Sequence, residues 1–419
     1  MFAALAHRDF RLLWAGLLFS FTGSYMQTAA VLWHVSLLVP DDRRALALGL
    51  VGLARIGPIL VFSLISGVAA DALNRRALML VTQSSMAVLA GVLSYTTLHG
   101  MTHVWPIYAL SVCSSAAGAF DLPARHALLP TLVPRQDLPN AIAMNAIAIQ
   151  VASVMGPAIG GFMIAGTNVG WVYAANAVSF LFVIGALVLM KGQGATHMTP
   201  RAGALAPGGF SLASGLEGLR FVFRAPLIRS TMLLDFFATF FSSATALLPI
   251  FAQDVLHVGA RGYGWLYAAP AAGALLASGV MVKAVDHIEH RGEVLVAAVL
   301  AYGAATLAFG LSTAFWLTFA CLAATGAADT VSAVFRNLIR QMETPDHLRG
   351  RMTGVNMVFF MGGPQLGELE AGLVANWLGP VVSVVTGGIG CLVATSWVAA
   401  ATPALRAYRR TEKPVPIEG

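Results

Sequence analysis

Residues 154–161 of the chain read VMGPAIGG, and they lie within a run from Asn140 to Met190 that contains no Asp, Glu, Lys or Arg. Apolar runs of about 18 or more residues recur along the chain, and each is long enough to cross a hydrocarbon core as a helix. Of the 419 residues, 58% are hydrophobic and only 11% are charged, whereas soluble domains contain about 25% charged residues. The composition therefore predicts an all-α membrane protein that crosses the bilayer many times.

The breaks between apolar runs predict about twelve spans. The longest break, residues 191–226, is rich in Gly, Pro, Ala and Thr. We therefore expect an N-terminal six-helix bundle over residues 1–190, a cytoplasmic linker over 191–226, and a C-terminal six-helix bundle with a cytoplasmic tail over 227–419. The predicted spans are 12–38, 45–70, 77–98, 104–128, 139–165, 170–190, 227–253, 262–284, 292–311, 314–340, 351–375 and 380–402.

The positions of the basic residues predict the orientation of these spans. If the N-terminus is cytoplasmic, only Arg43, Arg44 and Arg261 of the 25 lysines and arginines fall in outer loops, and Arg55 falls inside a span. Such a bias predicts that both termini are cytoplasmic. The net charge of +6 then reflects contact with anionic lipid of the inner leaflet, so it does not indicate a nucleic-acid partner.

The two halves of the chain also repeat each other weakly at a shift of 211 residues. The matched positions include Arg125 with Arg336, Asn145 with Asn356, Gly156 with Gly367, and Gly161 with Gly372. Two related bundles around a central cavity are typical of secondary transporters, which bind substrate near the bilayer midplane between the repeats.

The loop between spans two and three reads GVAADALNRR over residues 67–76. The spacing of Gly67, Asp71, Arg75 and Arg76 resembles a signature of the major facilitator superfamily, and the resemblance implies two pseudo-symmetric six-helix bundles. We expect Asp71 and the arginines to make charge and helix-end contacts that close the cytoplasmic side. The alternative is that these arginines only set the topology.

The segment VMGPAIGG resembles the antiporter signature of span five in the same superfamily, which implies an exporter. Pro157 removes one backbone donor and bends the helix, while small residues allow another helix to approach closely. We expect a sliding contact with the small residues of span eight, and the alternative is a packing kink. The motif residues are Gly156, Pro157, Gly160 and Gly161; the expected stripe is Ala152, Gly156 and Gly160, and its expected partner is Ala269, Gly273 and Ala277 in span eight.

Four longer stretches resemble the enterobactin-exporter-like branch of this superfamily, also called transmembrane secretion effectors. They are FDLPARHALLPTLVPRQDLPNAIAMN, GAADTVSAVFRN, TPDHLRGRMTGVN and GELEAGLVANWLGP. The resemblance implies export of a siderophore or an amphipathic drug across the bacterial inner (cytoplasmic) membrane, coupled to inward proton flow. It does not identify the cargo.

Candidates for substrate binding or proton coupling are ionisable residues inside the predicted spans, where each costs at least about 2.5 kcal/mol and therefore needs a partner or a function. Arg55 could hold an anionic substrate or counter a carboxylate, and the alternative is a snorkelling or internally paired arginine. Asp235 is a candidate proton carrier because burial favours the neutral form of a carboxyl group. The alternative is an acid satisfied by Arg229.

The remaining acidic candidates are Asp329, Glu368 and Glu370. Asp329 is expected either to face the cavity or to pair with Arg336 on the same helix. Glu368 and Glu370 are two residues apart, so they cannot both face the same way on a helix. Aromatic side chains are candidates for lining the cavity, with core packing as the alternative: Tyr25, Trp33, Phe236, Phe240, Phe359 and Phe360.

The sequence thus predicts a proton-driven exporter of a small molecule that acts as a monomer in the lipid bilayer. An importer and a non-transporting sensor on the same scaffold remain alternatives. The chain is not expected to be an enzyme or to need a cofactor or metal. None of its lysines follows a glycine, as a P-loop requires, and no H-E-x-x-H motif is present.

Overall fold

The computed structural model describes residues 3–190, 219–345 and 348–409, and within the helices it leaves out some side chains. The predicted linker lies almost wholly outside the described residues, as do the surroundings of Gly67 and the side chains of Asp71 and Phe360. The described part is helical and contains no strand. The predicted all-α fold is therefore confirmed.

The N-terminal half contains six long helices, and they follow the predicted spans closely because each apolar run ends at a polar loop. A short 3₁₀ helix, η1 (Ala3–Ala6), precedes them. The long helices are α1 (Arg8–Leu38), α2 (Asp41–Ala72), α3 (Arg75–Leu98), α4 (Trp105–Leu128), α5 (Leu138–Gly166) and α6 (Val169–Leu189), with the 3₁₀ turn η2 (Leu129–Thr131) after α4.

The C-terminal half repeats this arrangement and ends with a short helix. Its described elements are α8 (Pro226–Phe241), η3 (Ala244–Leu247), α9 (Leu248–Ile250), η4 (Phe251–Val255), α10 (Gly259–Ala284), α11 (Arg291–Leu311), α12 (Phe315–Glu343), α13 (Arg349–Leu378), α14 (Pro380–Ala401) and α15 (Pro403–Arg406). Among the described residues of both halves, nine helical segments are long and apolar enough to cross a membrane. The other long helices, α1, α4 and α13, coincide with predicted spans one, four and eleven.

Span seven differs from the prediction of one continuous helix over 227–253. Helix α8 ends at Phe241, and the chain continues through a 3₁₀ turn, a single α-turn and a π-helix from Phe251 to Val255. At the break, the Ser243 hydroxyl donates to the carbonyl oxygen of Thr239 at 2.5 Å, and Pro249 lacks a backbone donor. A side-chain hydroxyl that bonds a backbone carbonyl and a proline without a backbone N–H therefore interrupt the helix. Hydropathy alone predicts one continuous helix over this apolar run.

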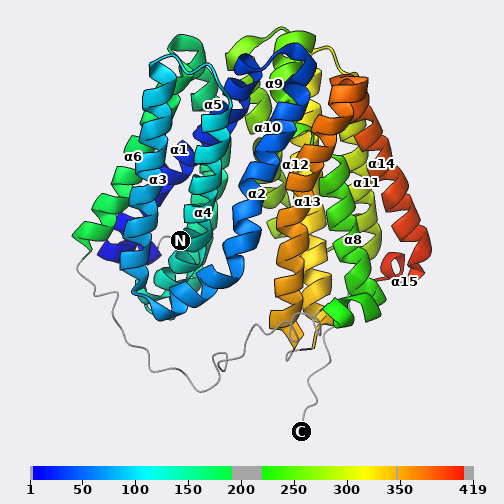
Figure 1. Cartoon of the computed structure of the whole chain (residues 1–419). Coiled ribbons are helices and arrows are strands. Elements are labelled where there is room, and N and C mark those ends of the chain that lie inside the picture. The colour runs from blue at the N-terminus through cyan, green and yellow to red at the C-terminus, as the bar shows by residue number, and fades with distance from the viewer. Residues whose placement is uncertain (1–2, 191–218, 346–347, 410–419) are drawn as a thin grey trace.

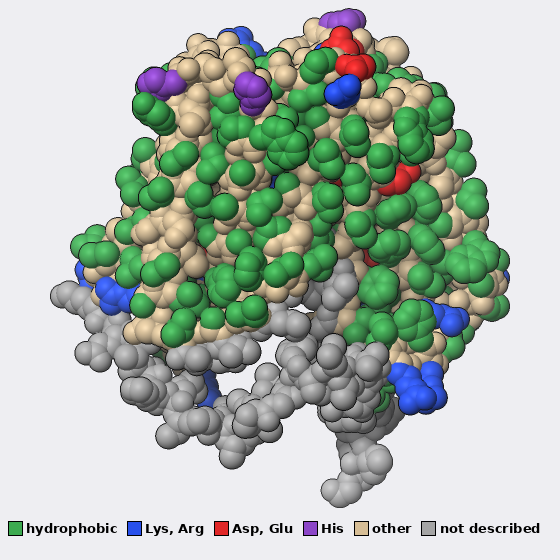
Figure 2. All heavy atoms as spheres, in the orientation of Figure 1, with side chains coloured by type: hydrophobic (Ala, Val, Ile, Leu, Met, Phe, Trp, Pro, Cys, Tyr) green, Lys and Arg blue, Asp and Glu red, His purple; other side chains and the backbone are tan. Residues whose placement is uncertain are grey.

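The helices form two groups that stand side by side, α1–α6 and α8–α14 (Figure 1). Helix α5 packs against α10 and α2 packs against α13, and these are the most extensive contacts between the groups. Hydrophobic side chains cover most of the middle of the face shown in Figure 2, while charged and histidine side chains gather mainly toward its two ends. This distribution suits a protein surrounded by lipid at mid-height.

The hydrophobic core is shared at one end and divided at the other. At the upper end in Figure 1, where α1 ends and α2 begins, Leu32, Leu48, Phe251 and Tyr263 belong to one cluster drawn from both groups. Toward the lower end, where α6 ends and α8 begins, the clusters are confined to one group each. Apolar packing therefore joins the two groups mainly at the upper end.

Candidate functional site

Helices α5 and α10 approach each other backbone to backbone at a pair of glycines. A methyl group added at Gly161 would lie 2.6 Å from the carbonyl oxygen of Ala260 and 2.7 Å from Cα of Gly264. One added at Gly264 would lie 2.7 Å from the carbonyl oxygen of Pro157. Two residues of the span-five motif, Pro157 and Gly161, therefore form a backbone contact between the two groups.

The contact between α2 and α13 has the same construction. A methyl group on Gly372 would lie 2.7 Å from the carbonyl oxygen of Ala45 and 2.8 Å from Cα of Gly49. One on Gly49 would lie 2.9 Å from the carbonyl oxygen of Glu368. Gly161 and Gly372 are matched in the sequence repeat, and so are Pro157 and Glu368. The repeat therefore places equivalent residues at the two contacts, which we call the glycine seams.

The other motif glycines face a different helix from the one expected. A methyl group on Gly156 would lie 2.7 Å from the carbonyl oxygen of Thr22, and one on Gly160 would lie 2.8 Å from Cγ of Met26, both in α1. The expected contact of Gly156 and Gly160 with the stripe of Ala269, Gly273 and Ala277 in α10 is therefore wrong, although Gly161, which was not part of the expected stripe, does meet α10. The reason is that Gly273 faces α12, where its methyl group would lie 1.8 Å from a carbonyl oxygen.

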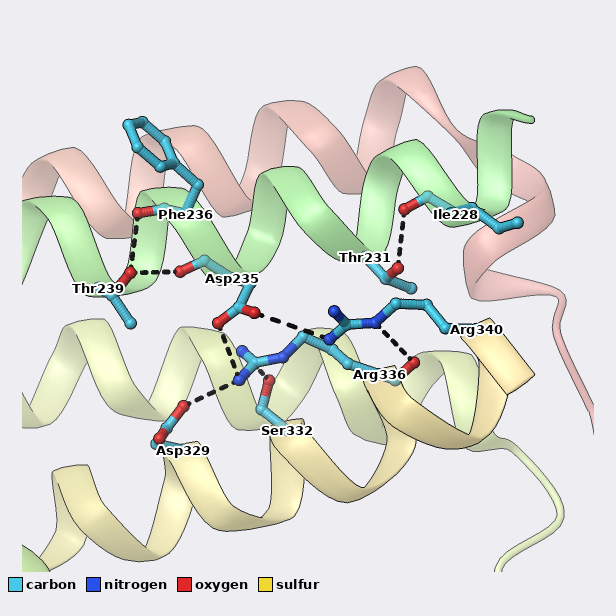
Figure 3. Close-up of polar contacts among 9 residues, drawn as sticks. All are labelled: Ile228, Thr231, Asp235, Phe236, Thr239, Asp329, Ser332, Arg336 and Arg340. Atoms are coloured by element: carbon cyan, nitrogen blue, oxygen red, sulfur yellow. Dashed lines mark hydrogen bonds and ion pairs between the residues drawn. The ribbon is translucent and has the colours of Figure 1, made fainter. Parts of the chain in front are cut away.

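A charge network joins α8 to α12 near the lower end (Figure 3). The Asp235 side chain is 2% exposed. Its Oδ1 lies 3.1 Å from Nη2 of Arg336, and its Oδ2 lies 3.7 Å from Nη2 of Arg340. The alternative in which Arg229 satisfies this acid is wrong as to the partner, because Asp235 pairs with arginines of α12 instead.

The same network contains Asp329. Nη2 of Arg336 lies 3.1 Å from Oδ1 of Asp329, and Nη1 of Arg336 donates to the Ser332 hydroxyl at 2.9 Å. The predicted pair of Asp329 with Arg336 is therefore confirmed. Arg340 was missed, although its spacing of four residues from Arg336 places both arginines on one face of the helix.

Arg55 lies at the boundary between the two groups. Its Nη2 donates to the Thr28 hydroxyl at 2.9 Å, and its charge interacts with Tyr25, Tyr267 and Glu368. Glu368 is 6% exposed, and its Oε2 has no hydrogen-bond partner among the described residues. The fold therefore brings two of the five ionisable candidates close together, one from each group.

Glu368 and Glu370 do point in different directions along α13. Glu368 faces α2, where a methyl group on Gly52 would lie 2.7 Å from its Oε2. Glu370 is only partly buried. The structure therefore brings Glu368, and not Glu370, to Arg55.

A polar cavity of about 200 Å³ lies among the helices of the N-terminal group. Its walls come from α1, α2, α3, α4 and α6, and Arg55 is its charged lining residue. This cavity could not be predicted from the sequence, because single serines and amides in apolar helices carry no signal of the face on which they lie. The lining residues are Ser24, Gln27, Thr28, Val31, Arg55, Met86, Ser111, Ser114, Ser115, Asn176 and Phe180.

The aromatic candidates whose side chains are described are not among the residues that line this cavity: Tyr25, Trp33, Phe236, Phe240 and Phe359. Trp33 packs in the shared core with its ring centroid 5.1 Å from that of Tyr263. Phe236 stacks on Phe240 at 5.4 Å and meets Phe359 edge-on at 6.0 Å, so these rings join α8 to α13. Their positions are those of packing groups between helices.

Polar contacts reinforce the shared core at the upper end. Nη1 of Arg44 in α2 lies 2.8 Å from Oδ2 of Asp254 in η4, and Arg44 also pairs with Asp41. The Gln253 amide donates to the Ser36 hydroxyl at 2.8 Å, and the Tyr263 hydroxyl donates to the carbonyl oxygen of Ala29 at 2.8 Å. The two groups are therefore tied to each other at this end by charge, hydrogen bonds and apolar contact.

The loop motif between α2 and α3 makes helix-end contacts within its own group. Nη1 of Arg75 donates to the carbonyl oxygen of Ala127 at 3.0 Å, and Nη2 of Arg76 donates to that of Val188 at 3.2 Å. Carbonyl groups at helix C-termini attract cations. The arginines therefore bind the ends of α4 and α6, whereas the role expected for Asp71 lies outside the described side chains.

Comparisons with known proteins agree with this architecture. The family model described as transmembrane secretion effector matches residues 1–413. The enterobactin exporter of Escherichia coli strain 536 is 27% identical over 363 residues, which are 87% of this chain and 85% of that protein. The enterobactin exporter of Escherichia coli O1:K1 is 27% identical over 355 residues, 85% and 83% of the two chains.

Solved structures share the fold at low sequence identity. A bacterial homologue of the human lysosomal transporter Spinster, inward-facing and unoccupied, has a TM-score of 0.70 at 16% identity and covers 97% of this chain and 98% of its own. A POT family transporter in complex with a thioalcohol-conjugated peptide has a TM-score of 0.72 at 11% identity, with 95% and 96% coverage. The chain therefore belongs to the transmembrane secretion effectors of the major facilitator superfamily, and its family and fold are those of a multi-pass transporter rather than an enzyme.

Proposed function

We propose that the protein exports a small amphipathic molecule, a siderophore or a drug, across the bacterial inner membrane by proton antiport with alternating access. Its relatives named as enterobactin exporters support export. In this proposal the protein works as a monomer. Bundles 1–190 and 227–419 move against each other, and the linker 191–226 and both termini are cytoplasmic, as the bias in Lys and Arg indicates.

The observation that carries this proposal is the uneven division of the core. At the upper end a shared apolar cluster, the glycine seams and the Arg44–Asp254 pair join the bundles. At the lower end each cluster belongs to one bundle. With the termini in the cytoplasm, this is the state closed toward the outside. The seams allow the bundles to rock because backbone approaches backbone closely at their glycines.

Two repeat-matched asparagines support a second state. Asn145 in α5 and Asn356 in α13 lie toward the lower ends of the seam helices, and the side-chain oxygen of each is buried without a hydrogen-bond partner among the described residues. An unpaired buried acceptor is costly. We expect these oxygens to accept hydrogen bonds from the opposite bundle when the lower end closes.

Asp235 is the proton carrier in this proposal. Its carboxylate is the group that ties α8 to α12 through Arg336 and Arg340. A proton on Asp235 removes that charge and so loosens α8, which also packs against seam helix α13 through Phe236 and Phe359. If cargo and proton favour opposite states, each displaces the other, as antiport requires.

The test uses inverted membrane vesicles containing the full chain, with an imposed acid interior. We expect uptake of at least one member of a panel of siderophores and macrolides, and loss of this uptake in Asp235→Asn. The control is Glu293→Gln, because Glu293 is an exposed acid in α11 outside the network and should leave uptake unchanged.

Two other outcomes would replace the proposal. Uptake that requires an alkaline vesicle interior would identify an importer. Tight binding of a panel member without any transport in either gradient would identify a sensor. Proton-driven transport that is unaltered in Asp235→Asn would overturn the assignment of the carrier alone.

A further inference from the structure

The polar cavity is lined by side chains of the N-terminal group alone. All of its lining residues belong to α1, α2, α3, α4 and α6. Eight of the eleven are polar or charged, and none is acidic. A polar space in an apolar bundle is costly unless something fills it. The polarity and charge of the lining residues therefore indicate what kind of molecule the cavity can bind.

The charge of this cavity comes from Arg55. A guanidinium group has five N–H donors, and Arg55 contacts Thr28 and Tyr267, which leaves donors for an oxyanion. The carboxylate that interacts with it, Glu368, belongs to the other group, and the two form no direct ion pair in the described structure. Arg55 is thus a cation in a low-dielectric site with incomplete compensation.

The remaining walls offer further donors and one apolar side. The hydroxyls of Ser111, Ser114 and Ser115 line the cavity and have no partner among the described residues. Oε1 of Gln27 accepts from Nδ2 of Asn176 at 2.7 Å, which leaves the Gln27 amide as a donor. Val31, Met86 and Phe180 form the apolar side. This arrangement suits an oxyanion attached to a flat apolar body.

We infer that this cavity binds a carboxylate-bearing aromatic or aliphatic group of the transported molecule, with Arg55 as its counter-ion and the α4 serines as hydrogen-bond donors. This inference deepens the proposed export function. It depends on that function only for the identification of the bound group as part of a transported molecule. A cavity of about 200 Å³ accommodates a single aromatic acid, so a larger cargo would insert one such group. Glu368 opposes this binding because a second negative charge faces the same guanidinium.

The test measures binding to the full chain in lipid nanodiscs by calorimetry. The probes are 2-hydroxybenzoate, an anion, and 2-hydroxybenzamide, a neutral molecule of nearly the same shape. We expect wild type to bind the anion about tenfold or more tightly than the amide, since one charge-assisted contact supplies that difference. Arg55→Gln should abolish this preference, and Arg55→Lys should retain part of it.

Glu368→Gln provides the more discriminating test, because this variant is expected to bind the anion more tightly, whereas Arg55→Gln is expected to lose the preference for the anion. Removing its charge should tighten binding of 2-hydroxybenzoate severalfold and leave 2-hydroxybenzamide unchanged. The matched control is Arg43→Gln, an arginine on the same helix whose side chain is 79% exposed, and it should retain the wild-type preference. A general defect in folding would not tighten binding of 2-hydroxybenzoate in Glu368→Gln while removing the preference for it in Arg55→Gln.

Equal affinity of wild type for both probes would overturn the inference, as would a preference that survives in Arg55→Gln. Weaker anion binding in Glu368→Gln would also contradict it. These outcomes are separable from the proposed function. If uptake is proton-driven but binding shows no preference for the anion that depends on Arg55, only the inferred binding site is contradicted. If the anion is bound selectively but neither gradient drives uptake, only the proposed transport function is contradicted.

Discussion

Arg125 and Arg336 occupy matched positions of α4 and α12, but they obtain their counter-charges differently. Arg125 pairs with Asp121, four residues earlier on its own helix, and Asp121 also accepts hydrogen bonds from Thr82 and Gln83 at 2.9 Å each. In α12 the position matched to Asp121 is Ser332, whose hydroxyl accepts a hydrogen bond from Arg336. The counter-charges of Arg336 are instead Asp329 on the same helix and Asp235 on α8.

This difference indicates that the two halves perform different tasks. The acid of Arg125 lies on the same helix, so the pair is preserved when helices move. The acid of Arg336 lies partly on another helix, so the state of Asp235 affects how α8 sits against α12. The N-terminal half keeps the counter-charge of Arg125 on the same helix and contains the polar cavity, whereas in the C-terminal half Arg336 is linked to a second helix through Asp235, the proposed proton carrier.

The largest expected effect comes from breaking that link. Asp235→Asn removes the acid shared by two buried arginines and leaves Asp329 paired with Arg336 alone, and losing one partner of a buried pair costs about 3–5 kcal/mol. We expect thermal unfolding in detergent to shift strongly downward, and proton-driven transport to be lost in the protein that remains folded.

A transplant sharpens the comparison. The double variant Asp235→Asn with Ser332→Asp rebuilds the arrangement of α4 in α12 by placing an acid four residues before Arg336. We expect it to recover much of the thermal stability but not the pH dependence of transport. Recovery of both would mean that any acid beside Arg336 suffices, and the distinction between the two halves would be wrong.

The reciprocal change affects the N-terminal half. Asp121→Ser leaves the charge of Arg125 unpaired and removes the acceptor shared by Thr82 and Gln83. We expect a loss of about 2–3 kcal/mol in stability, with the dependence of transport on pH unchanged. A shifted pH profile in a folded Asp121→Ser protein would show that this pair also participates in coupling.

The glycine seams should respond equally, since they are equivalent in the repeat. Gly161→Ala and Gly372→Ala each place a methyl group within 2.7 Å of a backbone oxygen, and overpacking of this kind costs about 1–3 kcal/mol. We expect slower transport in both variants. Gly185→Ala is the control because nothing lies within 4 Å of its methyl position; unequal effects at the two seams would contradict the symmetry.

The smallest effect is expected at the upper end. The side chain of Asp254 is 51% exposed, and ion pairs of this kind contribute about 0–1 kcal/mol. Asp254→Asn should shift the balance between states slightly, and the shift should shrink at high salt. Transport rates measured at two ionic strengths check this, and a severalfold, salt-independent change would assign a larger role to the pair.

Sequence alone located the spans well because a lipid-facing helix needs an unbroken apolar run. It missed the interruption of span seven, where Ser243 and Pro249 act locally within such a run. It also missed Gly49 and Gly264, because a glycine in a helix does not reveal which neighbour it faces.

For a related reason, the sequence could predict contacts of the candidate site within one helix but not those between helices. Asp329 and Arg336 lie seven residues apart on one helix, so periodicity could pair them. Asp235 with Arg340, and Arg55 with Glu368, depend on how distant helices pack. Nothing in the local pattern around these residues indicates their partners.

The shared core at the upper end also has a thermal consequence. Opening this end exposes apolar side chains from both groups, such as Leu32, Leu48 and Phe251, to water. Hydrating apolar surface raises the heat capacity, so the enthalpy of switching between states must itself change with temperature. In the proposed cycle, the protein is therefore expected to show a curved Arrhenius plot for transport.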